Sequence, residues 1–372
     1  MARIDPKPDN QRGRHPAILP PVSEPPALLE ELLGAPAPSG YEGPASEVWR
    51  RAASFASLTI DALGSSVARI GDEDAKPLLA VVGHIDEIGL VITHVDEKGF
   101  LYFAPIGGWD PQILVGQRVQ IQGRDGPVTG VIGRKPIHLL KDEQRKKVVE
   151  LRDMHVDIGA TGNREALERV RVGDPAVIAG GPVRLTGGRL VSRSLDDRLG
   201  AYVALEALRR VHERGGLRGR MAAVAAVQEE IGSQGARTTA FSLEPNMALA
   251  VDVTHATDAP GVEEKELGHH PLGSGPVIGR GATLSPRIFE LLAETAERLG
   301  IAHSVEASGH STRTDADAIQ ITRAGIPAGL VSIPLRYMHS PVEMVDLADV
   351  EATIELVAAF AQALEPGLDL TR

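Results

Sequence analysis

The sequence predicts an α/β fold, a mixed sheet flanked by helices, with a small β-rich domain inserted into it. Strand-like apolar runs alternate with helical segments over most of the chain, which is typical of a sheet covered on both faces. A central block, from about His94 to Thr186, instead contains short alternating segments separated by glycine turns. Acidic and histidine side chains directly follow several of the predicted strands.

The composition is typical of a globular protein and argues against several functions. A length of 372 residues suggests two or three domains, and an apolar fraction of 42% is enough for a sizeable core. The net charge of −11 argues against a nucleic-acid-binding protein, which would carry a basic face. No apolar run reaches the roughly 18–20 residues of a membrane span. We therefore expect no nucleic-acid partner, no membrane contact and a cytoplasmic location.

The amino-terminal segment, residues 1–26, is predicted to be a disordered tail. It is rich in proline, arginine and aspartate, and it lacks the apolar stretch of a secretory signal. Structure is expected to begin near Pro26 with a short helix over Leu28–Leu33. A loop rich in proline and glycine follows over Ala35–Gly43, and a second helix is expected over Pro44–Ser57.

The first strands are predicted where short apolar runs lie between turn residues. Two short strands, Leu58–Ile60 and Ser66–Ile70, are joined through Gly64. A continuous apolar run over Pro77–Val82 has the length of a buried strand and leads directly to His84.

The β-rich block divides the chain into two predicted domains. Residues 94–186 would form the inserted β domain, and residues 27–93 with 187–366 would form the catalytic domain. Strands are expected in the insert over Gln117–Gln122, Val128–Gly133 and Asp174–Ile178.

Helices and strands alternate again after the insert. The helices are expected over Ser194–Glu213, Ser285–Leu299 and Asp346–Leu364. The strands are expected over Met221–Val227, Met247–Val251 and Gly329–Ile333. In the first helix, Ser194 is the expected N-cap residue, and Asp197 three residues later completes a capping-box pattern.

Two adjacent acids, Glu229 and Glu230, directly follow a strand-like segment. Like charges at this distance raise each other's pKa and resist burial. A divalent metal ion would offset that cost. One glutamate would then bind metal, while its neighbour stays free to move protons.

Other segments supply matching ligand types. They are His84 with Asp86, Asp196 with Asp197, Asp252 at a strand end, and His339 after the last strand. Because open α/β sheets bind ligands at the carboxyl ends of their strands, we expect these side chains to converge. The chain has no cysteine, so any metal must be held by imidazole and carboxylate groups.

Each of these residues also has an ordinary structural explanation. A lone histidine after a strand is often a hydrogen-bonded structural residue, and acids at a helix start are favoured by about 0.3–1 kcal/mol. Asp197 is interpreted as a helix cap rather than as part of the site. Asp86 lies two residues from His84 on the same side of an extended chain, where it can orient the imidazole. Together the residues favour a two-metal hydrolase, with the ions about 3.5–4 Å apart.

Five segments carry a more specific signal. They are Gly-His-Ile-Asp-Glu-Ile-Gly-Leu (83–90), Ser-Leu-Asp-Asp-Arg-Leu-Gly (194–200), Gln-Glu-Glu-Ile-Gly-Ser-Gln-Gly-Ala (228–236), Val-Asp-Val-Thr-His-Ala (251–256) and Tyr-Met-His-Ser-Pro-Val-Glu (337–343). In this order they resemble the dinuclear-metal aminopeptidases that form hollow tetrahedral particles. That family includes glutamyl and deblocking aminopeptidases, and some members carry an old endoglucanase label. The resemblance spans about residues 28–364.

The resemblance implies a role for each candidate residue. The ligands would be His84 and Asp252 for one metal ion, Glu230 and His339 for the other, and Asp196 as the bridge between them. Glu229 would be the general base, and Asp86 would orient His84. The ions would be zinc, with cobalt as the alternative. Peptides would be the substrates, the insert would serve oligomerisation or substrate access, and the chain would form a dimer or a dodecamer.

Other functions stay open from the sequence. An N-acyl amino-acid deacylase or a carboxypeptidase would use the same fold, and a non-catalytic relative would keep it. A glycosidase needs carboxylates about 5–9.5 Å apart across the bond, whereas Glu229 and Glu230 point to opposite sides of an extended chain. The roles of His255, His310 and the loop over Gly309–Asp317 are also open. The family often has a shorter Gly-Thr-Asp-Ala form of this loop, so substrate preference is undetermined.

Overall fold

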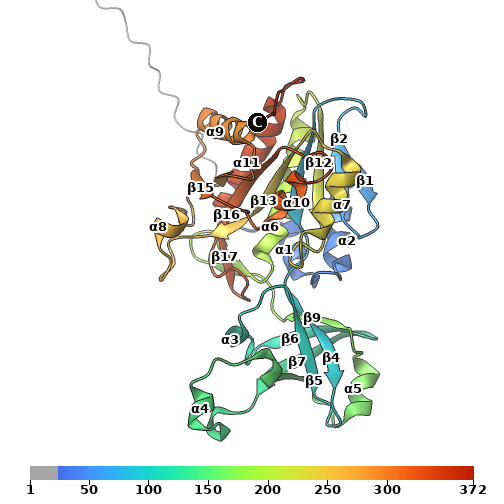
Figure 1. Cartoon of the computed structure of the whole chain (residues 1–372). Helices are drawn as coiled ribbons and strands as arrows, with labels where there is room; N and C mark the ends of the chain where they lie inside the picture. Colours follow the sequence, from blue (N-terminus) through green and yellow to red (C-terminus); the bar gives the residue numbers. More distant parts are fainter. Residues whose placement is uncertain (1–23) are drawn as a thin grey trace, which may run out of the picture.

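The computed structural model describes residues 24–372 and confirms the predicted fold class. The main body is an eight-stranded mixed sheet with helices on both faces, and a small closed barrel lies at one end of it (Figure 1). The predicted disordered tail lies outside the described residues, apart from positions 24–26. Within the described range, no helix combines the length and apolar character needed to cross a bilayer.

The centre of the main sheet is parallel. In spatial order its strands are β1 (Ser57–Ile60), β2 (Ser66–Ile70), β12 (Arg220–Ala226), β3 (Leu78–His84), β13 (Met247–His255), β16 (Ala328–Leu335), β14 (Val277–Gly281) and β15 (Ser304–Ser308). The four central strands β12, β3, β13 and β16 run parallel to one another. Their carboxyl ends therefore lie at the same edge of the sheet. β2 and β14 pair antiparallel to this central group.

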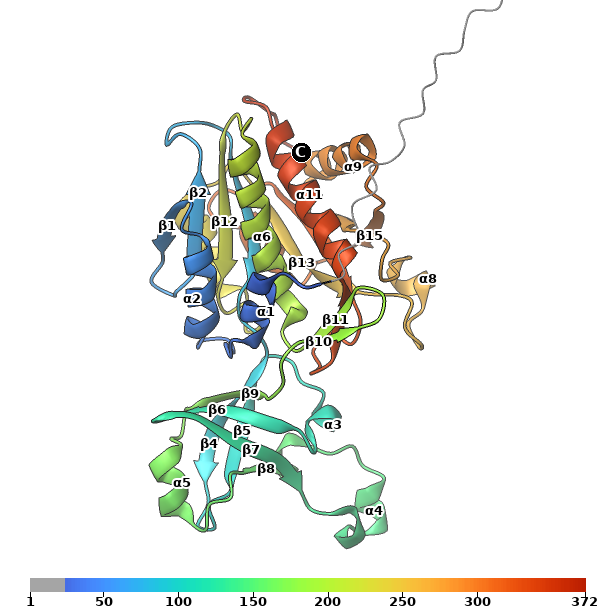
Figure 2. The same ribbon diagram turned by 180° about the vertical axis from the view of Figure 1, so that it is seen from behind.

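Helices cover both faces of the sheet (Figures 1 and 2). One face carries α1 (Ala27–Gly34), α2 (Gly43–Ala52), α6 (Leu195–Arg214), α9 (Pro286–Leu299) and α11 (Leu347–Ala363). The other face carries α7 (Gln234–Leu243) and α10 (Asp315–Gln320). Along β3, Leu79 and Val81 pack in the first core, whereas Leu78, Ala80 and Val82 pack in the second. Because side chains alternate along a strand, burial of both faces explains the continuous apolar run in the sequence.

The insert forms a closed six-stranded barrel. Its strands, in order around the barrel, are β4 (Gly89–Val95), β5 (Leu101–Ile106), β8 (Met154–Asp157), β7 (Gly126–Arg134), β6 (Arg118–Gly123) and β9 (Pro175–Ile178). Short helices lie outside it: α3 (Pro111–Leu114), α4 (Asp142–Arg145) and α5 (Asn163–Arg169). The barrel interior is a separate aliphatic core. The division into domains at residues 94 and 186 stays a prediction. The first strand of the barrel, β4, begins five residues before the first of these positions, at Gly89.

A small third sheet connects the barrel to the main body. It contains β10 (Val183–Leu185), β11 (Arg189–Ser192) and β17 (Glu343–Asp346), all antiparallel. β11 leads into α6 (Figure 2), and β17 leads into α11 (Figure 1). A short helix, α8 (Glu264–Leu267), lies on the loop after β13.

The start of α6 differs from the prediction. Ser194 adopts a left-handed conformation with φ of 62°, and its side chain makes no capping hydrogen bond. Asp196 and Asp197 have non-helical backbone angles, so the regular helix begins after them. Oδ1 of Asp197 instead accepts the N–H of Gly200 at 2.8 Å. The prediction of a cap at Ser194 was therefore wrong, because Ser194 is left-handed and the two aspartates that follow are not yet helical.

Two glycines allow α6 to pack directly on the sheet. A Cβ atom built on Gly83 would lie 2.1 Å from the carbonyl carbon of Gly200. A Cβ atom built on Gly200 would lie 2.3 Å from Oδ2 of Asp197 and from the carbonyl oxygen of Val251. No side chain fits at either position without moving backbone. This close contact brings Asp196 and Asp197, at the start of α6, to the end of β3, where Oδ2 of Asp197 accepts the N–H of His84 at 3.1 Å.

We predict that Gly200→Ala lowers the free energy of unfolding by about 1–3 kcal/mol, because it overpacks this contact. Urea unfolding followed by circular dichroism, with EDTA present, measures the change independently of bound metal. Gly34→Ala at the end of α1 is the matched control, since a Cβ atom there meets nothing within 4 Å. Its free energy of unfolding should change by less than about 0.5 kcal/mol. Equal effects of the two substitutions would contradict the packing argument.

Candidate active site

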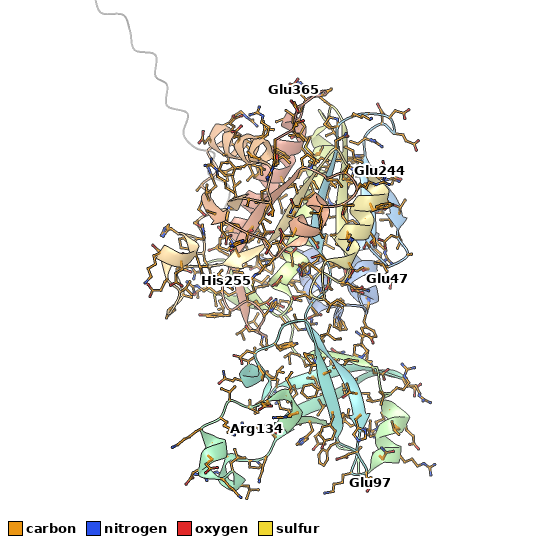
Figure 3. The ribbon with its side chains drawn as sticks, viewed as in Figure 1. Glu47, Glu97, Arg134, Glu244, His255 and Glu365 are labelled. Atoms are coloured by element: carbon orange, nitrogen blue, oxygen red, sulfur yellow. The ribbon has the colours of Figure 1, made fainter. Side chains whose placement is uncertain are left out.

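The predicted ligands converge at the carboxyl edge of the main sheet. His84 is the last residue of β3, and β4 of the barrel begins only five residues later in sequence, at Gly89. One cavity of about 500 Å³ is lined by His84, Asp196, Glu229, Glu230, Asp252 and His339. His255, which the sequence left open, also lines this cavity and lies at the barrel side of the sheet (Figure 3). His310 is exposed and is not among the lining residues.

Asp196 lies between the two histidines. Its Oδ1 atom is 3.2 Å from Nε2 of His84, and its Oδ2 atom is 3.4 Å from Nε2 of His339. Nε2 of His339 also lies 3.2 Å from Oε1 of Glu230. A carboxylate whose two oxygens face two different groups has the arrangement of a bridging ligand. The geometry is therefore compatible with two neighbouring cations.

Two sets of ligand atoms are close enough to surround an ion. His84, Asp197 and Asp252 offer atoms that all lie within 4.8 Å of one another. His84, Asp196 and Glu230 form a second such set. Ligands bound at about 2 Å from an ion lie within about 4 Å of each other, so both sets approach the required spacing. Asp197, interpreted from the sequence as a cap, thus also faces the candidate site.

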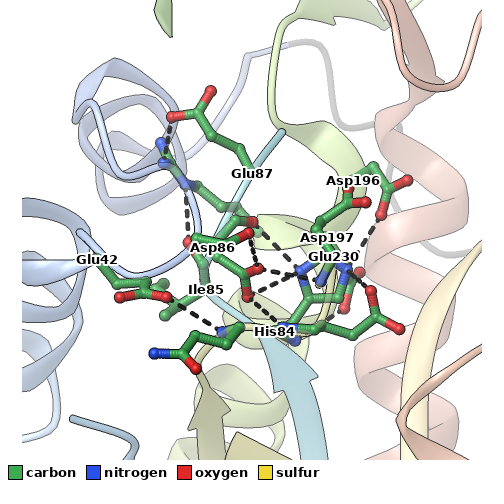
Figure 4. A network of polar contacts seen from close by, with 12 residues as sticks. Glu42, His84, Ile85, Asp86, Glu87, Asp196, Asp197 and Glu230 are labelled. Carbon is green, nitrogen blue, oxygen red and sulfur yellow. Dashed lines mark hydrogen bonds and ion pairs between the residues drawn. The ribbon is translucent and has the colours of Figure 1, made fainter. Parts of the chain in front are cut away.

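Asp86 connects His84 to the glutamate pair (Figure 4). Nδ1 of His84 lies 3.2 Å from the backbone oxygen of Asp86 and 3.5 Å from its Oδ1. The two carboxylate oxygens accept the N–H groups of Glu229 and Glu230 at 3.1 and 3.2 Å. The hydroxyl of Ser39 donates to Oδ2 at 2.7 Å. Burial alone would raise the pKa of Asp86, but these hydrogen bonds and the charge of His84 lower it.

The loop Gly107–Trp109 of the inserted barrel also reaches the site. Nδ1 of His339 lies 3.0 Å from the carbonyl oxygen of Gly108. A carbonyl can only accept a hydrogen bond, so Nδ1 carries the proton and Nε2 is free to bind an ion. Gly107 has φ of 73°, and a Cβ atom there would lie 2.6 Å from Cγ2 of Ile88. Glycine is therefore needed at this point of close approach.

The cavity contains more buried carboxylates than cations. Burial raises the pKa of Asp252 well above its usual range, and the charge of Asp197 adds to this effect. Burial raises the pKa of Glu229 to about 8, although His84 opposes it. The pKa of Glu230 is also raised, mainly by burial. Divalent ions would restore the ionised forms. The donor types, the bridging geometry and this excess of acid therefore fit a pair of metal ions.

A neighbouring acid shows the opposite situation. Glu87 is buried but pairs with Arg193 and, at 2.7 Å, with Arg198. Burial would raise the pKa of Glu87, but the two guanidinium groups lower it below its usual range. Arg198 also donates from Nε to the carbonyl oxygen of Ile85 at 3.3 Å. This acid has two guanidinium groups as partners, whereas the only basic side chains within ion-pair distance of the acids of the cavity, among the described residues, are the imidazoles of His84 and His339.

The structure reveals two acids to which the sequence assigned no role. Glu343, at the start of β17, is only 2% exposed. Its Oε1 accepts the N–H of His339 at 3.0 Å, and its Oε2 accepts the N–H of Asp196 at 3.1 Å. Glu343 therefore fixes the backbone of two candidate ligands. It lies in the 337–343 segment that carried the resemblance, but its contact with Asp196 spans 147 residues, so no local pattern predicts it.

Asp315 is the second of these acids. It is the first residue of α10, is 2% exposed, and belongs to the 309–317 loop. Within the described part of the chain, neither carboxylate oxygen has a hydrogen-bond partner of ordinary length. Burial raises its pKa to about 7, and its charge contributes to the raised pKa of Glu229. Asp315 thus adds to the negative potential around the glutamate pair.

Comparison with known proteins identifies the family. The sequence profile described as M42 glutamyl aminopeptidase matches residues 64–356. The chain belongs to this family. The lysyl aminopeptidase of Pyrococcus furiosus is 35% identical over 353 residues, which cover 92% of this chain and 98% of that protein. The match confirms the resemblance inferred from the five segments.

Solved structures of this family have the same fold. A TET aminopeptidase from a marine sediment Thaumarchaeota archaeon superposes with a TM-score of 0.86 at 34% identity, covering 91% of this chain and 96% of that one. The TET1 peptidase of Pyrococcus horikoshii has a TM-score of 0.81 at 33% identity, covering 91% and 99%. That peptidase can assemble into a tetrahedron or a large octahedral shell.

We predict that Glu343→Gln weakens metal binding about 10–100-fold and lowers the free energy of unfolding by about 1–3 kcal/mol. Glutamine has one acceptor atom, so one of the two backbone N–H groups would lose its partner. Titration against a competing chelator and urea unfolding measure the two effects. Glu351→Gln on α11 is the control, because its part-exposed pair with Arg210 should contribute no more than about 1 kcal/mol. Wild-type metal affinity in Glu343→Gln would disprove the positioning role.

Proposed function

We propose that the chain is a dinuclear metal-dependent aminopeptidase that removes N-terminal residues from peptides. The observation that carries this proposal is the position of Asp196 between His84 and His339, in a cavity lined by further carboxylates. Membership of the M42 family supports peptide-bond hydrolysis. Zinc fits the nitrogen and oxygen donors, with cobalt as the alternative.

The metal ligands are assigned as predicted from the sequence. One ion would be held by His84 and Asp252, the other by Glu230 and His339, and both by Asp196. Bound ions of this kind lower the pKa of water to about 7 and polarise the carbonyl group. Asp86 would hold the His84 imidazole and, through two backbone N–H groups, the positions of Glu229 and Glu230.

Glu229 has the position expected of a general base. Its side chain is 14% exposed toward the cavity, and its Oε2 atom lies 3.7 Å from Nε2 of His84. Its Oε1 accepts a hydrogen bond from the hydroxyl of Ser233 at 3.3 Å, which orients the carboxylate. Glu230, in contrast, faces His339. Glu229 would therefore take a proton from the attacking water and return it to the leaving amine.

The same cavity accounts for exopeptidase action. A free α-amino group is cationic near neutral pH, and the surplus carboxylates of the cavity would attract it. An N-acylated peptide lacks this charge. Glu230 faces His339 and Glu229 faces His84, so the two adjacent glutamates do not form the opposed acid pair of a glycosidase.

A homo-oligomer, dimer or dodecamer, is also part of the proposal, together with a cytoplasmic location. It is supported by the shells that the Pyrococcus horikoshii relative forms and by the inserted barrel as a candidate contact surface. The names of the relatives do not indicate one N-terminal residue, since one is a lysyl and another a glutamyl aminopeptidase.

The proposal predicts that aminoacyl p-nitroanilides are hydrolysed, that EDTA abolishes the activity, and that Zn²⁺, Co²⁺ or Mn²⁺ restores it. The reason is that the cavity acids bind both the ions and the free amine. Rates of hydrolysis of a panel of free-amine and N-acetylated aminoacyl p-nitroanilides, measured with EDTA and with each added ion, check this prediction. Preferential hydrolysis of the acetylated forms would indicate a deacylase instead, and cleavage only from the carboxyl end of a peptide would indicate a carboxypeptidase. Activity unaffected by EDTA would disprove metal dependence.

We predict that Glu229→Gln lowers kcat at least about 100-fold, because the amide cannot accept the proton from water. Elemental analysis of the purified variant should still find two ions per chain, since Glu229 is not assigned as a ligand. Glu244→Gln, an exposed position at the end of α7 that pairs with Arg323, should keep wild-type kcat. Wild-type turnover in Glu229→Gln would remove it from the base role.

A further inference from the structure

A second, smaller cavity adjoins the candidate metal centre. It has a volume of about 170 Å³, and we call it the side pocket. The two cavities have five lining residues in common: Val253, Thr254, Glu306, Thr312 and Thr314. Thr254 lies two residues after Asp252 on β13, hence on the same face of the strand. A ligand held at the metal centre can therefore extend a side chain into the side pocket.

The side pocket has apolar walls and one charged group. Leu284 and Leu330 line it, and both are buried. Among the twelve described residues that line it, Glu306 on β15 is the only one with an ionisable side chain. The carboxylate of Glu306 forms no hydrogen bond or ion pair within the described part of the chain. A half-buried carboxylate without a partner is poorly compensated, so a cationic ligand group would stabilise it.

The wall of the side pocket is held in place by a second acid. The carboxylate of Asp317 accepts the N–H of Thr312 at 3.0 Å and the N–H of Arg313 at 2.8 Å. The hydroxyl of Thr283 donates to the same carboxylate at 3.3 Å. The pocket is thus formed before a ligand binds, which reduces the entropy lost on binding.

We propose that the side pocket receives the side chain of the substrate's N-terminal residue, and that Glu306 selects lysine and arginine there. This inference rests on the proposed aminopeptidase function. The methylene stem would lie along Leu284 and Leu330, and the ammonium or guanidinium group would pair with Glu306. The α-amino group and the scissile carbonyl would stay in the larger cavity next to Asp252.

Arg313 favours a different substrate preference, for an acidic rather than a basic N-terminal residue. It lines the larger cavity, and its charge would attract an acidic N-terminal side chain. It does not line the side pocket, however, and it is exposed. A charge in open solvent is screened and contributes little. The half-buried Glu306 therefore decides the selectivity.

The experiment compares kcat/KM for Lys-, Arg-, Leu- and Glu-p-nitroanilide with the metal-loaded full-length enzyme. Wild type should prefer Lys and Arg over Leu, and Leu over Glu. In Glu306→Gln, the ratio of kcat/KM for Lys to that for Leu should fall about tenfold or more. Glu306→Lys should reverse the order of Lys and Glu. Glu297→Gln removes the same charge from an exposed site on α9 and should leave the Lys to Leu ratio unchanged.

The outcomes separate this inference from the function on which it rests. If no aminoacyl substrate is hydrolysed, the aminopeptidase proposal fails. If Leu-p-nitroanilide is hydrolysed but wild type prefers Glu, or Glu306→Gln keeps the wild-type ratio, only the assignment of Glu306 is overturned. A preference for Glu that disappears in Arg313→Gln would assign selectivity to Arg313 instead.

Discussion

The site depends on one electrostatic constraint: carboxylates from six segments (Asp86, Asp196 with Asp197, Glu229 with Glu230, Asp252, Asp315 and Glu343) lie buried together without enough protein cations to neutralise them. Glu87, three residues after His84 in the sequence, shows how the same fold stabilises an acid with two guanidinium groups. Asp252, Glu229 and Glu230 have no guanidinium partner among the described residues, and burial raises the pKa of each although His84 lies near Glu229 and His339 near Glu230. An arrangement of this kind is unfavourable unless external cations bind. The metal requirement that we propose therefore follows from the architecture of the cavity rather than from any single residue.

This constraint explains features that are otherwise unrelated. Gly83 and Gly200 let α6 approach β3 closely enough to bring Asp196 to the strand end. Glu343 then holds the backbone of Asp196 and His339 with its two oxygens, so that the Asp196 carboxylate and the His339 imidazole keep their distance. Asp86 does the same for the glutamate pair. The acids that hold backbone groups are as important to the geometry as the acids that face the cavity.

Much of the fold and most of the cavity could be predicted from the sequence, since both follow from local patterns. Buried strands appear as apolar runs, and the side chains after parallel strands must meet at one edge. The start of α6 was predicted wrongly because Ser194 and Asp197 match a capping box, whereas tertiary contacts with His84 and Glu343 accompany a non-helical backbone at Asp196 and Asp197. Glu343 and Asp315 were missed because their surroundings come from distant segments. The side pocket was missed because Glu306 lies on an edge strand that the sequence did not predict.

The hydrogen bond between the His339 imidazole and the carbonyl oxygen of Gly108 joins the main body to the inserted barrel. A small tilt of the barrel would displace this carbonyl, rotate the imidazole ring and change the distance from its Nε2 to Asp196. In the proposed metal centre, where Nε2 of His339 binds an ion, the affinity for that ion and the orientation of the barrel are consequently linked thermodynamically, so each must influence the other by the same free energy.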